Sequence, residues 1–302
     1  MLIDSHCHIH DLDTYKFAFS RAQISRKMLA KYPEMPHLKA DFTPDKLIER
    51  AHKNDVLKMI CIGTTHEDSL AARDFANTHS GDGIYWSYGI HPDEAGTNDF
   101  NSAELHVATT GAALRREPRN DGREQASSSV EFEAIRPIAI GEVGLDYHGK
   151  SIAENGADFR EQQIQLFEQM LQLARDNDLP LIFHVREAYE DFFAVLKNFP
   201  DVRGVVHSFS DSTDNLRESM ERGFYIGVNG MATFSEEIPL PPLERMLLET
   251  DAPFLTPVPF RGTINEPAYI KNICAYISKV KGESEQTVAR ITSENARKLF
   301  NI

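Results

Sequence analysis

The sequence has few cysteines, no long apolar run and no excess of basic residues. Its three cysteines, Cys7, Cys61 and Cys274, are widely spaced and odd in number. This excludes a disulfide-stabilised scaffold and is typical of a reducing compartment. No stretch reaches the ~18 to 20 consecutive apolar residues of a membrane span, and the first residues lack the basic start and apolar core of a signal peptide. We therefore expect a cytoplasmic protein that does not bind membranes.

Basic residues are in deficit. The 302-residue chain carries 32 lysines and arginines against 46 aspartates and glutamates, so its formal net charge is −14. This balance excludes a protein that coats nucleic acid through bulk positive charge, although a metal site could still hold a few phosphates. The sequence contains neither a Walker-type glycine-rich loop nor a C-x-x-C pair. Nucleotide-binding loops of that type and dithiol chemistry are therefore not indicated.

Apolar runs of strand length alternate with amphipathic stretches along the whole chain. The runs are rich in β-branched residues and nearly continuous, as is typical of parallel strands buried on both faces. The expected strands are 2–6, 56–63, 84–91, 135–141, 180–185, 204–209, 224–228 and 246–249, and the expected helices are 43–54, 67–79, 158–178, 187–198, 211–222, 266–279 and 284–300. This pattern predicts an α/β fold, a TIM (β/α)8 barrel in a single domain, 1–302; a doubly wound open sheet is the alternative.

Two segments interrupt this alternation. Residues 11–40 follow the first strand, and residues 115–130 precede the fourth. In a barrel, a segment after a strand lies on the catalytic face and a segment before a strand lies on the opposite face. We expect the first segment to be a lid or a substrate contact and the second to be a mobile surface loop.

The first of these segments has a charge opposite to that of the whole chain. Its basic residues are Lys16, Arg21, Arg26, Lys27, Lys31 and Lys39, against only Asp13 and Glu34, and its interleaved aromatic residues are Tyr15, Phe17, Phe19 and Tyr32. Single-stranded bases can stack on such rings, so the segment is a candidate substrate contact. The alternative is an amphipathic helix whose aromatic side chains pack on the barrel and whose charges are only solvated.

The placement of the histidines indicates a metal site. His6 and His8 form an H-x-H pair at the end of the first strand, where period-2 alternation directs both side chains to one side. Further residues of metal-ligand type stand at later strand ends: Glu142, His184, His207 and Asp251. Barrel sites are assembled from the carboxyl ends of different strands, so these residues are expected to converge. We assign structural or surface roles to His10, His37, His52, His66, His79, His106 and His148.

Several motifs carry a family resemblance. The opening Ile3-Asp4-Ser5-His6-Cys7-His8 is followed by Gly89-Ile90-His91-Pro92, Gly141-Glu142-Val143-Gly144-Leu145-Asp146-Tyr147, Pro180-Leu181-Ile182-Phe183-His184-Val185-Arg186, Leu248-Glu249-Thr250-Asp251-Ala252-Pro253-Phe254-Leu255, Arg261-Gly262 and Asn265-Glu266-Pro267. In this order they resemble the TatD family of metal-dependent hydrolases, within the amidohydrolase-like barrels. His207-Ser208-Phe209-Ser210 departs from the family's usual His-Cys-Phe-(Thr/Ser)-Gly but keeps the histidine.

The resemblance implies a TIM barrel with DNase or related phosphodiesterase activity, expected to be a 3'-5' exonuclease. It implies that His6, His8 and Asp251 hold one divalent metal ion, and that Glu142 bridges to a second ion held by His184 and His207. Mg²⁺, Zn²⁺ and Mn²⁺ all suit this mixture of imidazole and carboxylate. Paired ions can activate a water and stabilise both oxygens of a displacement.

Other residues have less certain assignments. Asp251 is the candidate general base, or it only holds metal, and both roles can coexist. His91 is either a contact to a substrate phosphate or a capping histidine fixed by Pro92. Arg186 either binds phosphate through its planar donors or pairs with Glu187 or Asp191. Among the further residues considered, Asp146 and Tyr147 follow Glu142, with Asp146 expected to support a ligand, and Arg261 is a candidate for positioning a loop.

Three functions are compatible with such a barrel. The expected one is hydrolysis of phosphodiester bonds in DNA, with DNA or another phosphodiester as the partner and no obligate protein partner. The same chemistry could instead hydrolyse an ester such as that of D-aminoacyl-tRNA. A catalytically silent barrel used as a binding module is the third. Released nucleotides, a released amino acid or no turnover would distinguish them.

Overall fold

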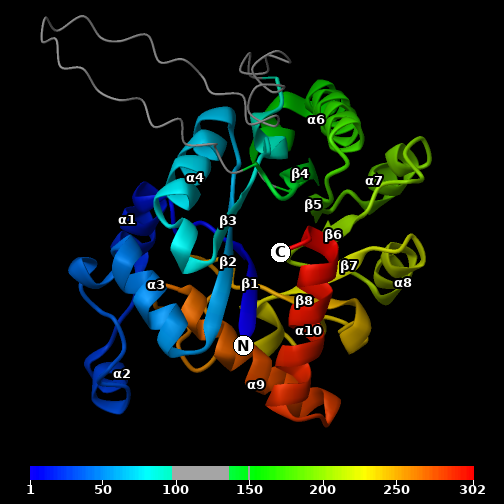
Figure 1. Ribbon diagram of the computed structural model, residues 1–302. Helices are drawn as coiled ribbons and strands as arrows, with labels where there is room; N and C mark the ends of the chain where they lie inside the picture. The colour runs from blue at the N-terminus through cyan, green and yellow to red at the C-terminus, as the bar shows by residue number, and fades with distance from the viewer. Residues whose placement is uncertain (97–135, 149) are drawn as a thin grey trace, which may run out of the picture.

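The computed structural model describes residues 1–96, 136–148 and 150–302. Its strands are β1 Leu2–Cys7, β2 Val56–Ile62, β3 Ile84–Ser87, β4 Ile140–Asp146, β5 Leu181–Arg186, β6 Gly204–Val206, β7 Tyr225–Val228 and β8 Met246–Leu248. Its α-helices are α1 Leu12–Arg21, α2 Arg26–Lys31, α3 Pro44–Lys53, α4 His66–Thr78, α6 Lys150–Asp176, α7 Tyr189–Leu196, α8 Thr213–Glu221, α9 Ile270–Lys281 and α10 Glu285–Phe300. Figure 1 shows the longer helices around the outside of the strands.

All neighbouring strands are parallel, and they form two sheets, β1-β2-β3 and β4-β5-β6-β7-β8. Backbone hydrogen bonds join the sheets at both seams. Asp251 N donates to His6 O (2.8 Å) and His8 N donates to Ala252 O (2.9 Å), while Tyr88 N donates to Ala139 O (3.1 Å) and Gly141 N donates to Tyr88 O (2.7 Å). The eight strands therefore follow one another around a ring, and the predicted TIM barrel is confirmed.

The seam between β3 and β4 depends on glycine. A Cβ atom on Gly89 would lie 2.2 Å from the carbonyl carbon of Gly141, so no side chain fits where the two backbones meet. At the other seam, Asp4 accepts hydrogen bonds from N (2.9 Å) and Oγ1 (2.5 Å) of Thr250. Both seams lie next to residues of the candidate site, Glu142 at one and Asp251 at the other.

The helices begin and end where local chemistry satisfies their free backbone groups. Thr65 caps α4 by accepting from Asp68 N, and Ser284 caps α10 by accepting from Thr287 N. Gly282 ends α9 in the left-handed region with φ 68°. Leu299 and Phe300 of α10 pack with strand residues such as Ile3 in an apolar cluster. None of the described helices is long and apolar enough to cross a membrane.

The fourth strand differs from its predicted position. The sequence predicts a strand at 135–141, whereas β4 runs from Ile140 to Asp146, and residue 135 lies outside the described residues. The apolar pattern breaks at Glu142 and Asp146, but both side chains are buried in the fold and belong to the strand. The helix predicted at 158–178 also begins earlier, at Lys150. The segment 115–130, predicted to be a mobile loop, lies outside the described residues.

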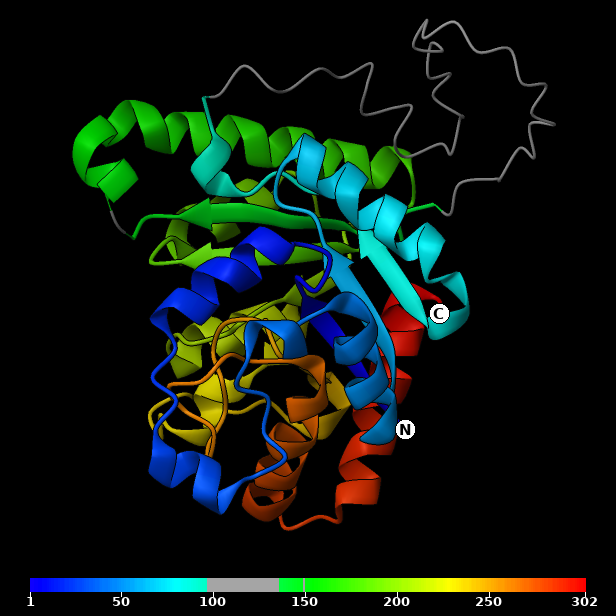
Figure 2. The same cartoon turned by 90° about the vertical axis from the view of Figure 1, so that its left-hand side faces the viewer.

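The first insert is built from α1, α2 and a 3-10 turn, Lys39–Asp41. In Figure 2, α1 and α2 (blue) lie on the side toward which the arrowhead of β4 (green) points. Gln23 N donates to Gly262 O (2.7 Å), which ties the insert to the loop after β8. The insert therefore lies on the face formed by the carboxyl ends of the strands, as predicted from its place in the chain.

Candidate metal centre

The six predicted ligands converge at the carboxyl ends of the strands. His6 lies on β1, Glu142 on β4 and His184 on β5, while His8, His207 and Asp251 follow β1, β6 and β8. All except the fully buried His6 line one cavity of about 570 Å³, which is in the usual range of small-molecule sites. The six ligand-type residues at different strand ends therefore meet at one site in the fold.

Glu142 is at the centre of this arrangement. Its Oε1 lies 2.5 Å from His184 Nδ1 and 2.9 Å from His207 Nε2, and its Oε2 lies 3.3 Å from His6 Nε2. The two oxygens thus face different histidines, as a carboxylate that bridges two ions does. Burial alone would raise the pKa of Glu142, but the charge of His207 and contacts from His184, His207 and His6 hold that pKa well below its usual range.

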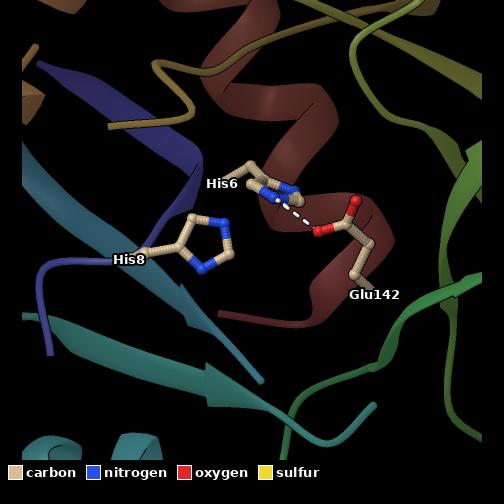
Figure 3. A group of neighbouring side chains, drawn as sticks. All are labelled: His6, His8 and Glu142. Carbon is tan, nitrogen blue, oxygen red and sulfur yellow. Dashed lines mark ion pairs between the residues drawn. The ribbon is translucent and has the colours of Figure 1, made fainter. Parts of the chain in front are cut away.

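The second carboxylate, Asp251, lies beside the H-x-H pair. Its Oδ1 is 3.5 Å from Nε2 of His6 and 3.5 Å from Nε2 of His8. The rings of His6 and His8 have centroids 5.2 Å apart, and Figure 3 shows both side chains near Glu142. Burial would raise the pKa of Asp251, but its contacts with His8, His6 and His207 lower it, so the carboxylate is charged at neutral pH.

Several buried polar atoms of the site make no hydrogen bond to the described protein groups, although some lie within ion-pair distance of a carboxylate. Neither ring nitrogen of the fully buried His6 has a hydrogen-bond partner among the described residues, and the same holds for His207 Nδ1 and Glu249 Oε2. Unpaired polar atoms in a protein interior are costly unless something else binds them. Burial and the charge of His207 lower the pKa of His6, which favours the neutral imidazole that binds metals. Imidazole and carboxylate together are a normal ligand set for divalent transition metals, so the residues present fit a metal site.

Two acidic side chains contact the ring nitrogens of His184 and His207 that do not face Glu142. Asp146 Oδ2 lies 2.9 Å from His184 Nε2, as expected for a residue that supports a ligand. The second one, Glu249, has no assigned role in the sequence-based prediction. It is fully buried, with Oε1 3.5 Å from His207 Nδ1, and it accepts from Ser208 N at 2.6 Å. Glu249 follows β8, which ends at Leu248, and Asp251 has φ 57°, so strand alternation gives no signal that could identify it.

His91 lies close to Glu142, not at the periphery of the cavity. Its Nε2 is 3.7 Å from Glu142 Oε1, its ring centroid is 4.5 Å from that of His184, and His91, Glu142 and His184 could hold an ion together. Its Nδ1 accepts from Asp93 N (3.2 Å) at the start of a short 3-10 turn. The histidine therefore caps this turn and also faces the candidate site.

Arg186 lines the cavity, and the two predicted alternative partners are otherwise engaged. Glu187 lies 2.6 Å from His148 Nδ1, and Asp191 accepts from the hydroxyl of Tyr147 at 2.7 Å. Tyr147 is thus bound to α7 rather than to a ligand. Among the described lining residues, Arg186 is the one lysine or arginine, and the acidic ones are Asp11, Asp68, Asp93, Glu94, Glu142 and Asp251. A cavity so acidic repels phosphate unless cations are bound in it.

The aromatic residues of the insert mostly pack inward. Tyr15 is buried, Phe19 packs against the core, and the ring of Tyr32 lies 5.0 Å from that of Phe260. Phe17 is exposed, with the Arg21 guanidinium 5.4 Å from its ring centroid. Asp11 and Thr14 line the cavity. The start of the insert therefore belongs to the candidate site, whereas three of its four aromatic side chains have packing roles.

Three further groups near the site, the buried side chains of His10 and Cys7 and the exposed Arg261, contact other protein groups. The side chain of His10 is fully buried, with Nε2 3.0 Å from Asp68 Oδ1, which agrees with its prediction as a structural histidine. Cys7 is buried and its thiol donates to Ile60 O (3.4 Å). Arg261 lies with its guanidinium 3.7 Å from the ring centroid of Phe234. His106 lies outside the described residues.

Comparisons with known proteins find several similar chains. Residues 3–301 match the family model described as TatD related DNase. The uncharacterized metal-dependent hydrolase YabD of Bacillus subtilis (strain 168) is 32% identical over 277 residues, covering 88% of this chain and 97% of that protein. The 3'-5' ssDNA/RNA exonuclease TatD of Erwinia tasmaniensis is 32% identical over 271 residues, covering 85% and 93%. The crystal structure of YjjV, a TatD homologue from Escherichia coli K12, matches with a TM-score of 0.72 at 24% identity, covering 100% and 98%.

Proposed function

Because this chain belongs to the TatD-related DNase family of metal-dependent hydrolases, we propose that it hydrolyses phosphodiester bonds at the 3' end of single-stranded DNA. The observation that carries the proposal is the position of Glu142, whose two oxygens face separate histidines in a buried site. A relative 32% identical to this chain is named a 3'-5' ssDNA/RNA exonuclease, which supports the choice of substrate and polarity.

In this proposal the residues divide into two groups around Glu142. His6, His8 and Asp251 would hold one divalent ion, His184 and His207 would hold another, and Glu142 would be available to both. Two such ions would lower the pKa of an attacking water and offset the charge on the phosphate. His91 is either a further ligand or a contact to a phosphate oxygen, since it faces Glu142 from the cavity wall.

The chain's own groups supply the remaining steps. Asp251 takes a proton from the attacking water as the water oxygen forms a bond to phosphorus. The bond from phosphorus to the 3'-oxygen of the preceding nucleotide breaks, and that oxygen takes up a proton from solvent. Arg186, at the rim of the cavity, binds the phosphate through planar donors. A terminal nucleoside 5'-monophosphate is released, and the shortened strand keeps a 3'-hydroxyl.

A substrate screen tests the proposal. Purified protein is stripped of metal, reloaded separately with Mg²⁺, Mn²⁺ or Zn²⁺, and incubated with 5'-labelled single-stranded DNA, duplex DNA, RNA and D-aminoacyl-tRNA. We expect progressive shortening of single strands from the 3' end and nucleoside monophosphates identified by mass. Release of an amino acid without nucleotides would identify an ester hydrolase instead. No turnover in any combination, with metal content verified, would indicate a binding module.

A further inference from the structure

One aromatic side chain in the cavity, that of Phe254, is not part of the buried hydrophobic core. Phe254 lines the cavity and its side chain is 40% exposed. It makes no ring–ring contact with the aromatic residues in the described part of the chain, whereas Phe260, six residues on, is stacked on Tyr269 at 4.5 Å. A large apolar surface exposed within a cavity of charged groups is typical of a ligand contact.

The backbone holds Phe254 in a fixed position relative to Asp251. Phe254 N donates to Asp251 O (2.8 Å), which closes a tight turn directly after the carboxylate. Asn265, fully buried, donates through Nδ2 to Phe254 O (2.5 Å) and to Thr250 O (2.8 Å). The exposed ring is thus mounted on the same rigid turn as the proposed general base, so little conformational freedom would be lost when it binds a ligand.

We infer that Phe254 stacks on the 3'-terminal nucleobase, which is next to the phosphodiester that is cleaved. This inference rests on the proposed function and adds to it the group that the enzyme holds besides the phosphate. Besides its carboxylates, histidines and Arg186, the cavity wall offers one phenylalanine, Phe254, on whose face every base can stack. Stacking is tolerant of sequence, so a terminal base of any identity is held, with larger purine rings held more tightly.

Phe234 provides a matched control. It is also a phenylalanine with 40% exposure, and it lies in the neighbouring loop after β7. It is not among the residues that line the cavity, and the Arg261 guanidinium lies over its ring at 3.7 Å. Phe234→Ala therefore removes the same exposed group from the same face of the barrel without removing a ring from the cavity.

The test combines protein variants with a modified substrate. Single-stranded DNA with a normal 3'-terminal nucleotide is compared with a strand whose terminal nucleotide is abasic, for wild type, Phe254→Ala, Phe254→Tyr and Phe234→Ala. We expect Phe254→Ala to lower kcat/KM about tenfold on the normal strand, from the usual strength of base–aromatic stacking, and to change the abasic strand less than about twofold. Phe254→Tyr should restore activity, and Phe234→Ala should leave both substrates unchanged.

Other outcomes overturn the inference in distinguishable ways. Equal losses on both strands with Phe254→Ala, in a variant whose melting temperature matches wild type, would mean that Phe254 is structural. Equal losses with Phe234→Ala and Phe254→Ala would mean that the effect does not depend on the cavity. If wild type released no nucleotide from any strand, the proposed function itself would fail and the base contact with it.

Discussion

The carboxylate of Glu249 faces His207 from the side opposite Glu142. Oε1 of Glu249 lies 3.5 Å from His207 Nδ1, while Nε2 of the same ring lies 2.9 Å from Glu142 Oε1. A Cβ atom on Gly227 would lie 2.4 Å from Glu249 Oε2, so only glycine at this position of β7 leaves room for the buried carboxylate. A residue placed in this way fixes the orientation of a ligand histidine.

Glu249→Gln should therefore weaken metal binding while leaving the six candidate ligands in place. The amide keeps the size of the side chain but loses the charge that orients His207. We expect metal affinity to fall about 10- to 100-fold, the usual effect of mutating a residue that supports a metal ligand. Competitive titration with a chelating dye measures this. Glu244→Gln, in the short 3-10 turn before β8, is the control and should bind metal as wild type does; unchanged affinity in Glu249→Gln would reduce that residue to a packing role.

Glu142→Ala tests the bridge. This change removes the carboxylate whose two oxygens contact His6 on one side and His184 and His207 on the other. We expect both ions to be lost or weakened together and hydrolysis to be abolished. Elemental analysis after gel filtration gives the metal content per chain. Two ions still bound at full occupancy would show that Glu142 does not join the two halves of the site.

Asp251→Asn separates proton transfer from metal binding. The substitution preserves size and one oxygen but removes the charge and the base. We expect turnover to fall at least ~100-fold, the scale of general-base loss, with part of the substrate binding retained. Metal content measured on the same sample distinguishes the two roles: retained metal with lost turnover identifies a base, and lost metal identifies a ligand. Near-normal turnover would exclude Asp251 from the proton-transfer role.

Removal of metal should abolish hydrolysis without unfolding the protein. The barrel has an extensive apolar core of its own, with Phe167, Phe183 and Phe192 fully buried and in mutual contact, so folding does not depend on the site. Far-ultraviolet circular dichroism before and after chelation should agree, and activity should return when metal is added back. Full activity after chelation, with metal loss confirmed by elemental analysis, would contradict a metal-dependent reaction.

The sequence predicts which ligand-type residues converge better than it predicts the residues that surround them. His6, Glu142, His184, His207 and Asp251 are recognisable because ligand-type residues interrupt apolar runs at strand ends, and parallel strands bring those ends together. The predicted boundaries of β4 are wrong for the same reason: its buried carboxylates look like the end of a strand.

Residues with supporting roles have no such signal. Glu249 lies 3.5 Å from His207 across 42 positions of sequence, so only the folded chain shows that it belongs to the site. Exposure is equally hidden. Phe254 and Phe260 stand in one loop, yet the first lines the cavity and the second packs on Tyr269. Spacing along the chain does not distinguish these two environments, because both follow β8 without a regular period.

The final prediction concerns the positively charged side chains of the insert. Lys16 is paired with Asp13 at 2.5 Å, so its charge is already offset. Arg21, in the last turn of α1, and the exposed Arg26 and Lys27, in the first turn of α2, lie on the carboxyl-end face. If they contact the strand beyond the cleaved bond, replacing all three with glutamine should weaken DNA binding and flatten its salt dependence. Every phosphate of a single strand that is no longer neutralised by the protein lowers the log–log slope by roughly 0.7.

Substrate length and a matched triple variant decide the outcome. A dinucleotide is too short to extend from the cavity to Arg21, Arg26 and Lys27, so its hydrolysis should stay near normal while longer strands bind more weakly. The control replaces Lys197, Lys279 and Lys298, which lie at the carboxyl ends of α7, α9 and α10. None of these lysines belongs to the insert or lines the cavity, so the control lowers the net charge equally but should leave the salt slope unchanged. Equal loss on short and long strands would give the insert a structural role, and the same slope change in both triple variants would reduce the effect to overall charge.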